Sequence, residues 1–151
     1  MSWSDRLREL GISLPSVVPP VAAYVPAART GSLVYTAGQL PMVDGKLAAT
    51  GKVGAEVKPE RARELARVCA LNALAAVDAL VGIDAVVRVV KVVGFVASAG
   101  GFTGQPAVVN GASELFGQIF GEAGQHARSA VGVAELPLGA PVEVEVIVEV
   151  G

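Results

Sequence analysis

The sequence has one cysteine, one histidine and no long run of lysine or arginine among its 151 residues. A single cysteine, Cys69, excludes an internal disulfide framework and any zinc site built from several cysteines. Because Cys69 lies in an apolar helical pattern, we expect a buried structural thiol rather than a nucleophile. The net charge of −2, without a basic cluster, gives no support for binding a polyanion, so we expect no nucleic-acid partner.

Apolar runs that could cross a membrane are also missing. Residues 12–28 and 92–113 carry no charge, but prolines interrupt the first stretch, and several glycines and Pro106 interrupt the second. Such residues break a membrane-spanning helix, so we expect no membrane partner. The N-terminus has charged residues from Asp5 onward and no apolar segment, so we expect no signal peptide and a cytoplasmic protein.

Apolar residues are nevertheless abundant, at 52% of the chain, and the mean hydropathy is positive. The length suits one domain with a core of its own. An Ala/Val-rich core would explain this composition. Apolar surface buried between subunits would explain it too, and for that reason we expect an oligomer.

The spacing of apolar residues predicts two main helices in a chain that otherwise forms a sheet. The first helix is expected over residues 58–80, with Pro59 in its first turn and Gly82 after its end; the second runs from Pro106 to about Gly121. The other expected elements are a helix over 4–10 capped by Ser4, a proline-rich linker over 13–20, strands within 21–39, over 84–98 and over 126–150, and residues 46–50 as a continuation of the sheet. We therefore expect an N-terminal helix and linker over 1–20 and one domain over 21–151.

The final strand is the clearest pattern, because valine alternates with a more polar set from residue 142 to 150. The valine row should face a core, and the glutamate row, Glu143, Glu145 and Glu149, should face solvent or a neighbouring subunit. The strand before it is expected to form a hairpin with it. That strand opens with Arg128, which needs an anion, either a protein carboxylate or a ligand.

The central strand over 84–98 is apolar on both faces, so it should be covered on both sides. Gly94 should mark a bulge or a close approach of the backbone. Arg88 and Lys91 are three residues apart, so a regular strand would point them to opposite faces. Regular alternation alone does not explain the positions of both cations.

Three motifs occur together: Tyr35-Thr-Ala-Gly-Gln-Leu-Pro41, Val109-Asn110, and Ala127-Arg-Ser-Ala-Val-Gly-Val-Ala-Glu-Leu-Pro137 followed by Val142-Glu-Val-Glu145. In this order they resemble the YjgF/RidA family, also called endoribonuclease L-PSP, over residues 21–150. The resemblance implies a chorismate-mutase-like α+β fold, with a mixed sheet and two helices packed on one face. It also implies a homotrimer with a central barrel and ligand clefts between subunits.

The resemblance further implies a chemistry. RidA-type members hydrolyse enamines and imines such as 2-aminoacrylate to 2-keto acids and ammonia, with no metal and no cofactor. Arg128 would bind the substrate carboxylate, and Glu143 would hold or activate water. Tyr24, Gly38 and Asn110 would complete substrate binding. The plainer alternatives are an ion pair for Arg128, an outward strand carboxylate for Glu143, a sheet aromatic for Tyr24 and helix polarity for Asn110.

Two positions depart from the family pattern: Ala37 replaces a serine, and Ala130 replaces a cysteine or threonine. Both changes remove hydrogen-bonding groups, so a second function stays open, a non-catalytic trimer that binds a small carboxylate or a protein partner. Endoribonuclease activity fits less well with a pI of about 5.4 and a single histidine. We expect that histidine, His126, to be solvated in a loop.

Overall fold

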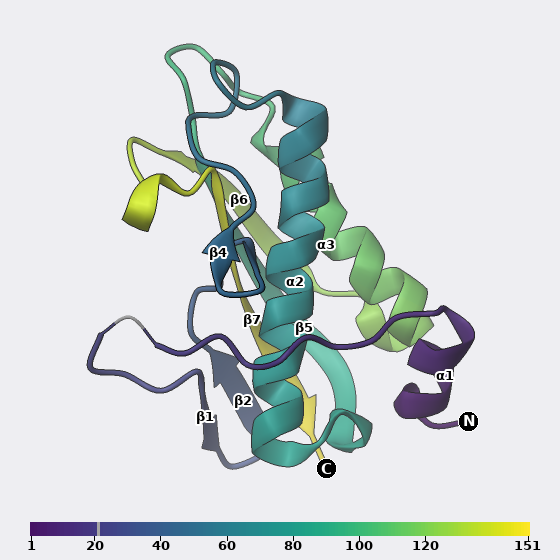
Figure 1. Ribbon diagram of the computed structural model, residues 1–151. Coiled ribbons are helices and arrows are strands. Elements are labelled where there is room, and N and C mark those ends of the chain that lie inside the picture. Colours follow the sequence, from purple (N-terminus) through teal and green to yellow (C-terminus); the bar gives the residue numbers. More distant parts are fainter. Residues whose placement is uncertain (21) are drawn as a thin grey trace.

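The structure is a computed structural model that describes residues 1–20 and 22–151 (Figure 1). Its elements are α1 (Trp3–Glu9), β1 (Ala27–Thr30), β2 (Leu33–Thr36), β3 (Met42–Val43), β4 (Lys46–Leu47), α2 (Pro59–Val81), η1 (Ile83–Ala85), β5 (Val86–Ala97), α3 (Gln105–Phe120), η2 (Gly121–Gly124), β6 (Ala127–Val133), η3 (Pro137–Gly139) and β7 (Val142–Val150). The predicted boundary of the domain at Val21 lies outside the described residues.

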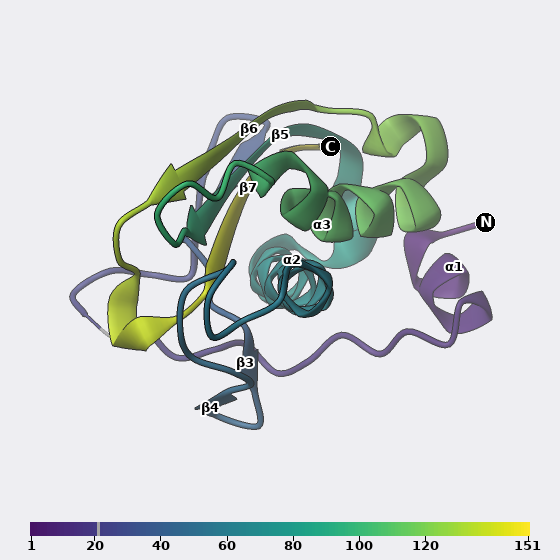
Figure 2. The same cartoon turned by 90° about the horizontal axis from the view of Figure 1, so that it is seen from above.

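Five strands form the main sheet in the order β1-β2-β7-β5-β6. β6 runs parallel to β5, whereas β7 is antiparallel to both β5 and β2, so the sheet is mixed. The helices α2 and α3 lie together on one face of it (Figures 1 and 2). This arrangement confirms the predicted α+β fold with two helices on one face of a mixed sheet.

Two strand pairings predicted from the sequence are wrong. β4 pairs with β3 in a separate small hairpin and does not continue the main sheet, because the turn at Asp44 and Gly45 folds the chain directly back. β6 and β7 do not form a hairpin: Ala97 pairs with Val133 and Val96 pairs with Val142, so the connection passes around the end of β5. β5 therefore separates the strand that carries Arg128 from the strand that carries Glu143.

The valine row of β7 forms the floor of the core, as predicted, and every valine from Val142 to Val150 in this row is buried. Gly94 marks a close approach rather than a bulge, because a side chain there would overlap Val109 of α3. Gly111 has the same role between the helices, where it lies against the backbone carbonyl of Arg63. Cys69 is buried, and burial raises the pKa of its thiol, which confirms a structural role.

Among residues 1–20 and 22–151, no helix covers the opposite face of the sheet, so the prediction that β5 is covered on both sides holds for one face only within this chain (Figure 2). Register shifts between Val86 and Arg88 and between Val89 and Lys91 change the alternation of β5. As a result Arg88 lies opposite Glu149 and Lys91 lies opposite Ile147, on the uncovered face. The second shift, between Val89 and Lys91, accounts for the opposite parity of these two cations, because it lies between them.

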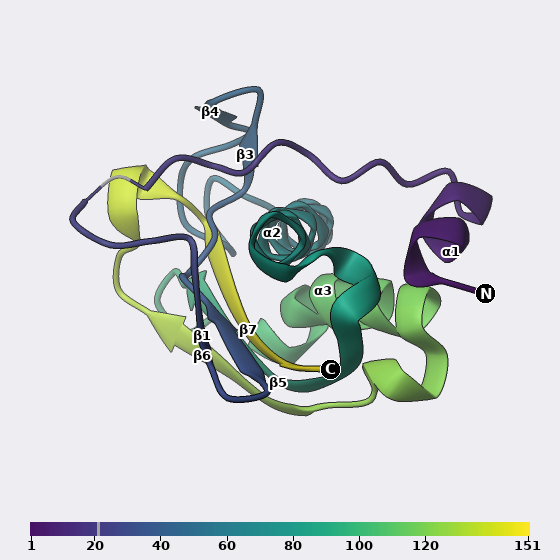
Figure 3. The same cartoon turned by 90° about the horizontal axis from the view of Figure 1, so that it is seen from below.

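The N-terminal helix α1 packs against the end of α3, with Trp3 edge-to-face on Phe120 at 5.0 Å between ring centroids. Ser2 caps this helix through a capping box, so the prediction that Ser4 is the cap is wrong; Ser4 instead binds the Asp84 carboxylate. The chain then runs along the side of α2 away from the sheet (Figures 2 and 3). No helix in the described ranges is long and apolar enough to cross a membrane.

Candidate functional site

Arg128 lies at the start of β6, which is an edge strand, and its side chain reaches the helix α3. It pairs with the buried Val92, so it points to the helix-covered face of the sheet. Its Nη1 donates to Asn110 Oδ1 at 2.8 Å and to Ser113 Oγ at 3.2 Å, and its Nη2 donates to the carbonyl oxygen of Pro106 at 3.3 Å. The structure therefore brings together two of the predicted residues, Arg128 and Asn110.

All three of these acceptors are uncharged oxygens. Within residues 1–20 and 22–151, no carboxylate forms an ion pair with Arg128. A guanidinium has five N–H groups, and these contacts use three of them. The Nε–H and one Nη2–H are left, a pair that matches the two oxygens of a carboxylate. The ion-pair alternative is thus unsupported, and the positive charge of Arg128 has no neutralising partner among the described residues.

His126 joins this cluster through Ser113, and neither residue was predicted to do so. Ser113 Oγ lies 2.8 Å from His126 Nε2, and His126 Nδ1 lies 2.6 Å from the carbonyl oxygen of Gly124. The prediction that His126 is solvated is wrong, because both ring nitrogens have protein partners. No spacing rule links residues 113, 126 and 128; only the packing of α3 on β6 shows that they meet.

Glu143 lies on the other face of the sheet, where it is opposite Phe95 of the neighbouring strand β5. Its carboxylate lies directly against Gly38, and a side chain at position 38 would overlap it. Glu143 is half-buried, and this burial, with a smaller contribution from the charge of Glu145, raises the pKa of the Glu143 carboxyl. The structure therefore brings together Gly38 and Glu143, with a carboxyl that holds its proton more readily than an ordinary glutamate.

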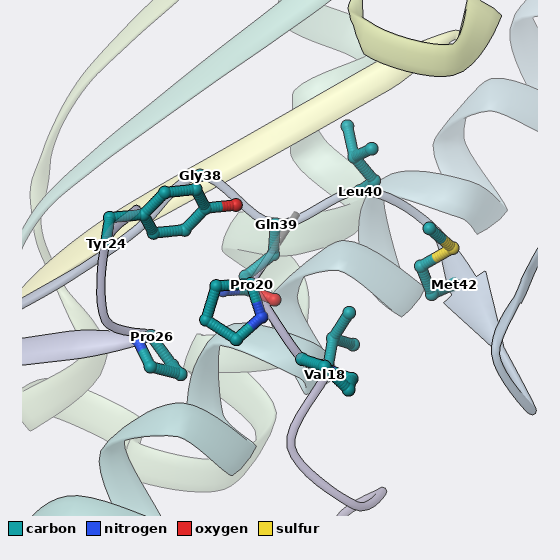
Figure 4. Close-up of a pocket in the computed structure, with 9 residues that line it drawn as sticks. Val18, Pro20, Tyr24, Pro26, Gly38, Gln39, Leu40 and Met42 are labelled. Carbon is teal, nitrogen blue, oxygen red and sulfur yellow. The ribbon is translucent and has the colours of Figure 1, made fainter. Parts of the chain in front are cut away.

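Tyr24, Gly38 and Gln39 line a small pocket of about 30 Å³ (Figure 4). Pro20 and Pro26 form part of its wall, and Figure 4 shows the Tyr24 ring next to Gly38. The pocket includes neither Arg128 nor Glu143 in its lining. It is large enough for water-sized groups only.

The five predicted residues thus form two separate groups in one chain. Arg128 and Asn110 lie at the β6 edge on the helix-covered side. Glu143 lies on the other face, because Val92 and Phe95 of β5 differ by an odd number of residues and so point to opposite faces. Gly38 lies against Glu143, and Tyr24 lines the pocket beside Gly38. One chain alone does not place the Arg128 guanidinium and the Glu143 carboxyl on the same side of the sheet.

The uncovered face mixes apolar and acidic side chains. Across the strands, Val131 of β6, Phe95 of β5 and Glu143 of β7 form one row, and Ser129, Val93 and Glu145 form the next. Val131 and Tyr35 are exposed on this face, at 43% each. Apolar side chains in adjacent rows are typical of a surface that another protein covers.

Comparison with known proteins identifies relatives along nearly the whole chain. The family model described as Endoribonuclease L-PSP matches residues 15–150. Protein TCP17 of Trypanosoma cruzi is 44% identical over 146 residues, which cover 95% of this chain and 91% of that protein.

Solved structures agree with this result. The protein Atu1372 of Agrobacterium tumefaciens, whose function is unknown, is 47% identical with a TM-score of 0.90, covering 99% of this chain and 92% of that one. The YjgF gene product of Escherichia coli is 27% identical with a TM-score of 0.65, covering 89% of this chain and 93% of that one.

Proposed function

Given that the chain belongs to the endoribonuclease L-PSP family, also called the YjgF/RidA family, we propose that it binds a small carboxylate between subunits and hydrolyses enamines or imines. The substrates are of the 2-aminoacrylate type, and the products are a 2-keto acid and ammonia. Arg128 holds the carboxylate of the substrate. Glu143 accepts a proton from the water that attacks the imine carbon and donates a proton to the nitrogen, so that the C–N bond breaks and ammonia leaves.

The state of Arg128 is the single observation that carries this proposal. Three neutral oxygens fix the guanidinium, no described carboxylate neutralises it, and two N–H groups are left. A half-buried cation that has only neutral oxygens as protein partners is a suitable place for an anion to bind. A bidentate carboxylate is the anion whose shape fits those two donors.

The carboxyl of Glu143 supports the catalytic part of the proposal. Hydrolysis of an imine needs a proton on nitrogen and a water activated at carbon, and one carboxyl can serve both steps by accepting a proton and then donating it. Burial raises the pKa of Glu143 and moves it toward neutral pH, which suits a group with this double role. Gly38 allows the Glu143 carboxyl to lie directly against the backbone, because a side chain at position 38 would overlap it.

Association of subunits is needed to complete such a site. Arg128 and Glu143 point to opposite faces of one sheet, so the two act on one substrate only if they come from different protomers. We propose a homotrimer in which the uncovered faces surround a central barrel and each cleft combines the Arg128 group of one protomer with the Glu143 group of the next. Sedimentation should give a mass three times the 15.3 kDa of one chain. A monomer at micromolar concentration would contradict this.

A non-catalytic trimer that binds a small carboxylate is the second candidate. Ala37 and Ala130 favour it, because neither side chain can hydrogen-bond a substrate or water. Arg128 would have the same role in both candidates, whereas Glu143 would be needed only for hydrolysis. We also propose that residues 1–20 form a short helix and a proline-rich linker ahead of the domain 21–151, and that the protein is cytoplasmic.

The test is release of ammonia and pyruvate from 2-aminoacrylate that a second enzyme generates in the assay. The wild-type protein should accelerate release over the no-protein control, and Arg128→Ala should abolish the acceleration. Arg61→Ala is the matched control, since Arg61 is an exposed arginine that pairs with Glu64 on its own helix. If the wild type behaves as the no-protein control does, the enzyme proposal fails and the binding trimer is left.

A further inference from the structure

We propose that Ser113 and His126 are positioning residues for Arg128, and that together they set the affinity of the site for a carboxylate. This inference rests on the proposed function, since it concerns the same arginine. It goes beyond that function by adding two residues, neither of which is expected to touch the ligand. Both lie outside the three sequence motifs that indicate the family.

The hydrogen bonds of this cluster have only one consistent direction when His126 is neutral. The carbonyl oxygen of Gly124 can only accept, so the proton of the neutral ring lies on Nδ1. His126 Nε2 is then an acceptor, and the Ser113 hydroxyl must donate to it across 2.8 Å. With its proton committed, Ser113 Oγ presents lone pairs to Arg128 Nη1 at 3.2 Å.

This chain of hydrogen bonds holds one end of the guanidinium in place. Nη1 is shared between Asn110 on one turn of α3 and Ser113 on the next, and Nη2 is held at Pro106 in the first turn. Rotation about the last bonds of the side chain would break all of these contacts together. The two remaining N–H groups therefore keep a fixed direction before the ligand binds, which lowers the entropy lost on binding.

The same geometry also resembles a nucleophilic serine with its base, and one observation argues against that use. Arg128 Nη1 donates a hydrogen bond to the serine oxygen, so that oxygen already serves as an acceptor for the guanidinium. An N–H donated to Ser113 Oγ also withdraws the electron density that an attacking oxygen needs. Positioning is the role that all five hydrogen bonds of the cluster support.

The test measures binding of 2-oxobutanoate, a stable 2-keto acid, by calorimetry on the full-length protein. Ser113→Ala removes the hydroxyl and should weaken binding by roughly fivefold to tenfold. Ser113→Thr keeps the hydroxyl and should bind within about twofold of wild type. His126→Ala should resemble Ser113→Ala, and the double variant should be no weaker than either one, because the two residues act in one chain of hydrogen bonds.

Ser98→Ala is the matched control. The Ser98 hydroxyl also makes two hydrogen bonds, to Val96 and from Gln105, but it does not touch Arg128. The Ser98→Ala variant should bind 2-oxobutanoate as wild type does. Its free energy of unfolding in urea should fall by about as much as that of Ser113→Ala. Equal losses of affinity in Ser113→Ala and Ser98→Ala would mean a general structural effect and would overturn the inference.

Arg128→Ala separates failure of the inference from failure of the proposed function. It should weaken binding by about thirtyfold or more. If Arg128→Ala binds as wild type does, the proposed function fails and the inference with it. If Arg128→Ala loses binding while Ser113→Ala and His126→Ala bind as wild type does, the inference alone is wrong.

Discussion

The two faces of the main sheet differ in what covers them and in the chemistry they carry. The face under α2 and α3 is closed by the valine row of β7, and Val144, Val146 and Val148 are at most 1% exposed. The other face alternates Phe95, Val93 and Ile147 with the carboxylates of Glu143 and Glu145. The covered face is lined mainly by buried apolar side chains, which have a structural role, and Arg128 lies at its β6 edge; the mixed face suits contact with a second protein and a ligand.

The largest effect is expected when an apolar residue of the covered face becomes charged, compared with a charged residue of the mixed face that becomes apolar. Val146→Asp places a carboxylate under α2 without a partner and should lower the free energy of unfolding by more than about 4 kcal/mol. Glu145→Val, one residue away on the other face, should leave the fold intact. Urea unfolding of both variants checks this, and a Val146→Asp protein as stable as Glu145→Val would contradict the assignment of the faces.

Two glycines of α3 test how closely the helix layer is packed. Gly111→Ala would push a methyl group into the backbone carbonyl of Arg63 and should cost about 2–3 kcal/mol of unfolding free energy. Gly117→Ala is the matched control on the same helix, because nothing lies within 4 Å of the added carbon. It should be neutral or stabilise the protein by up to about 1 kcal/mol, since alanine favours a helix. Equal effects in both variants would mean that the helices are not in close contact at Gly111.

The smallest expected effect is a pH dependence of the free energy of unfolding that comes from Glu143 on the mixed face. The pKa of Glu143 is raised by burial, so the folded protein binds this proton more tightly than the unfolded chain does. The resulting stability is fully present below the ordinary glutamate pKa of about 4.3 and is lost as the pH rises through the folded value.

Glu143→Gln removes this dependence, so the variant should gain stability relative to wild type between pH 4 and pH 7. Unfolding in urea at the two pH values measures it. Glu122→Gln, at an exposed position of η2, is the control and should show no such gain. A constant difference between Glu143→Gln and wild type at both pH values would show that burial does not disfavour the Glu143 charge.

Much of the fold could be predicted from the sequence because its signals are local. Alternating valines define β7, three-four spacing defines α2, and the motifs around Arg128 and Glu143 point to the family that the comparisons show. The pairing of β6 could not be predicted in this way, because a connection of eight residues fits a hairpin as well as a passage around the end of β5. The side of the sheet on which Arg128 lies depends on that pairing, so the separation of Arg128 from Glu143 was not visible in the sequence.

The Ser113–His126 pair was missed for a similar reason. A serine in the middle of an apolar helix and a histidine in a loop are common and carry no motif. They meet only because Gly94 lets Val109, and α3 with it, approach β5 closely. The two bulges of β5 were likewise indicated only by the unexplained parity of Arg88 and Lys91, with no signal for their positions.

The central claim is that Arg128 of one protomer and Glu143 of another act on one substrate. Refolding an equal mixture of Arg128→Ala and Glu143→Gln chains tests it most directly, with ammonia release from 2-aminoacrylate as the readout. Each variant alone should be almost inactive. If trimers form at random, three quarters contain both chains and one of their three clefts is intact, so the mixture should recover about a quarter of wild-type activity. A mixture no more active than its better parent would contradict a site shared between subunits.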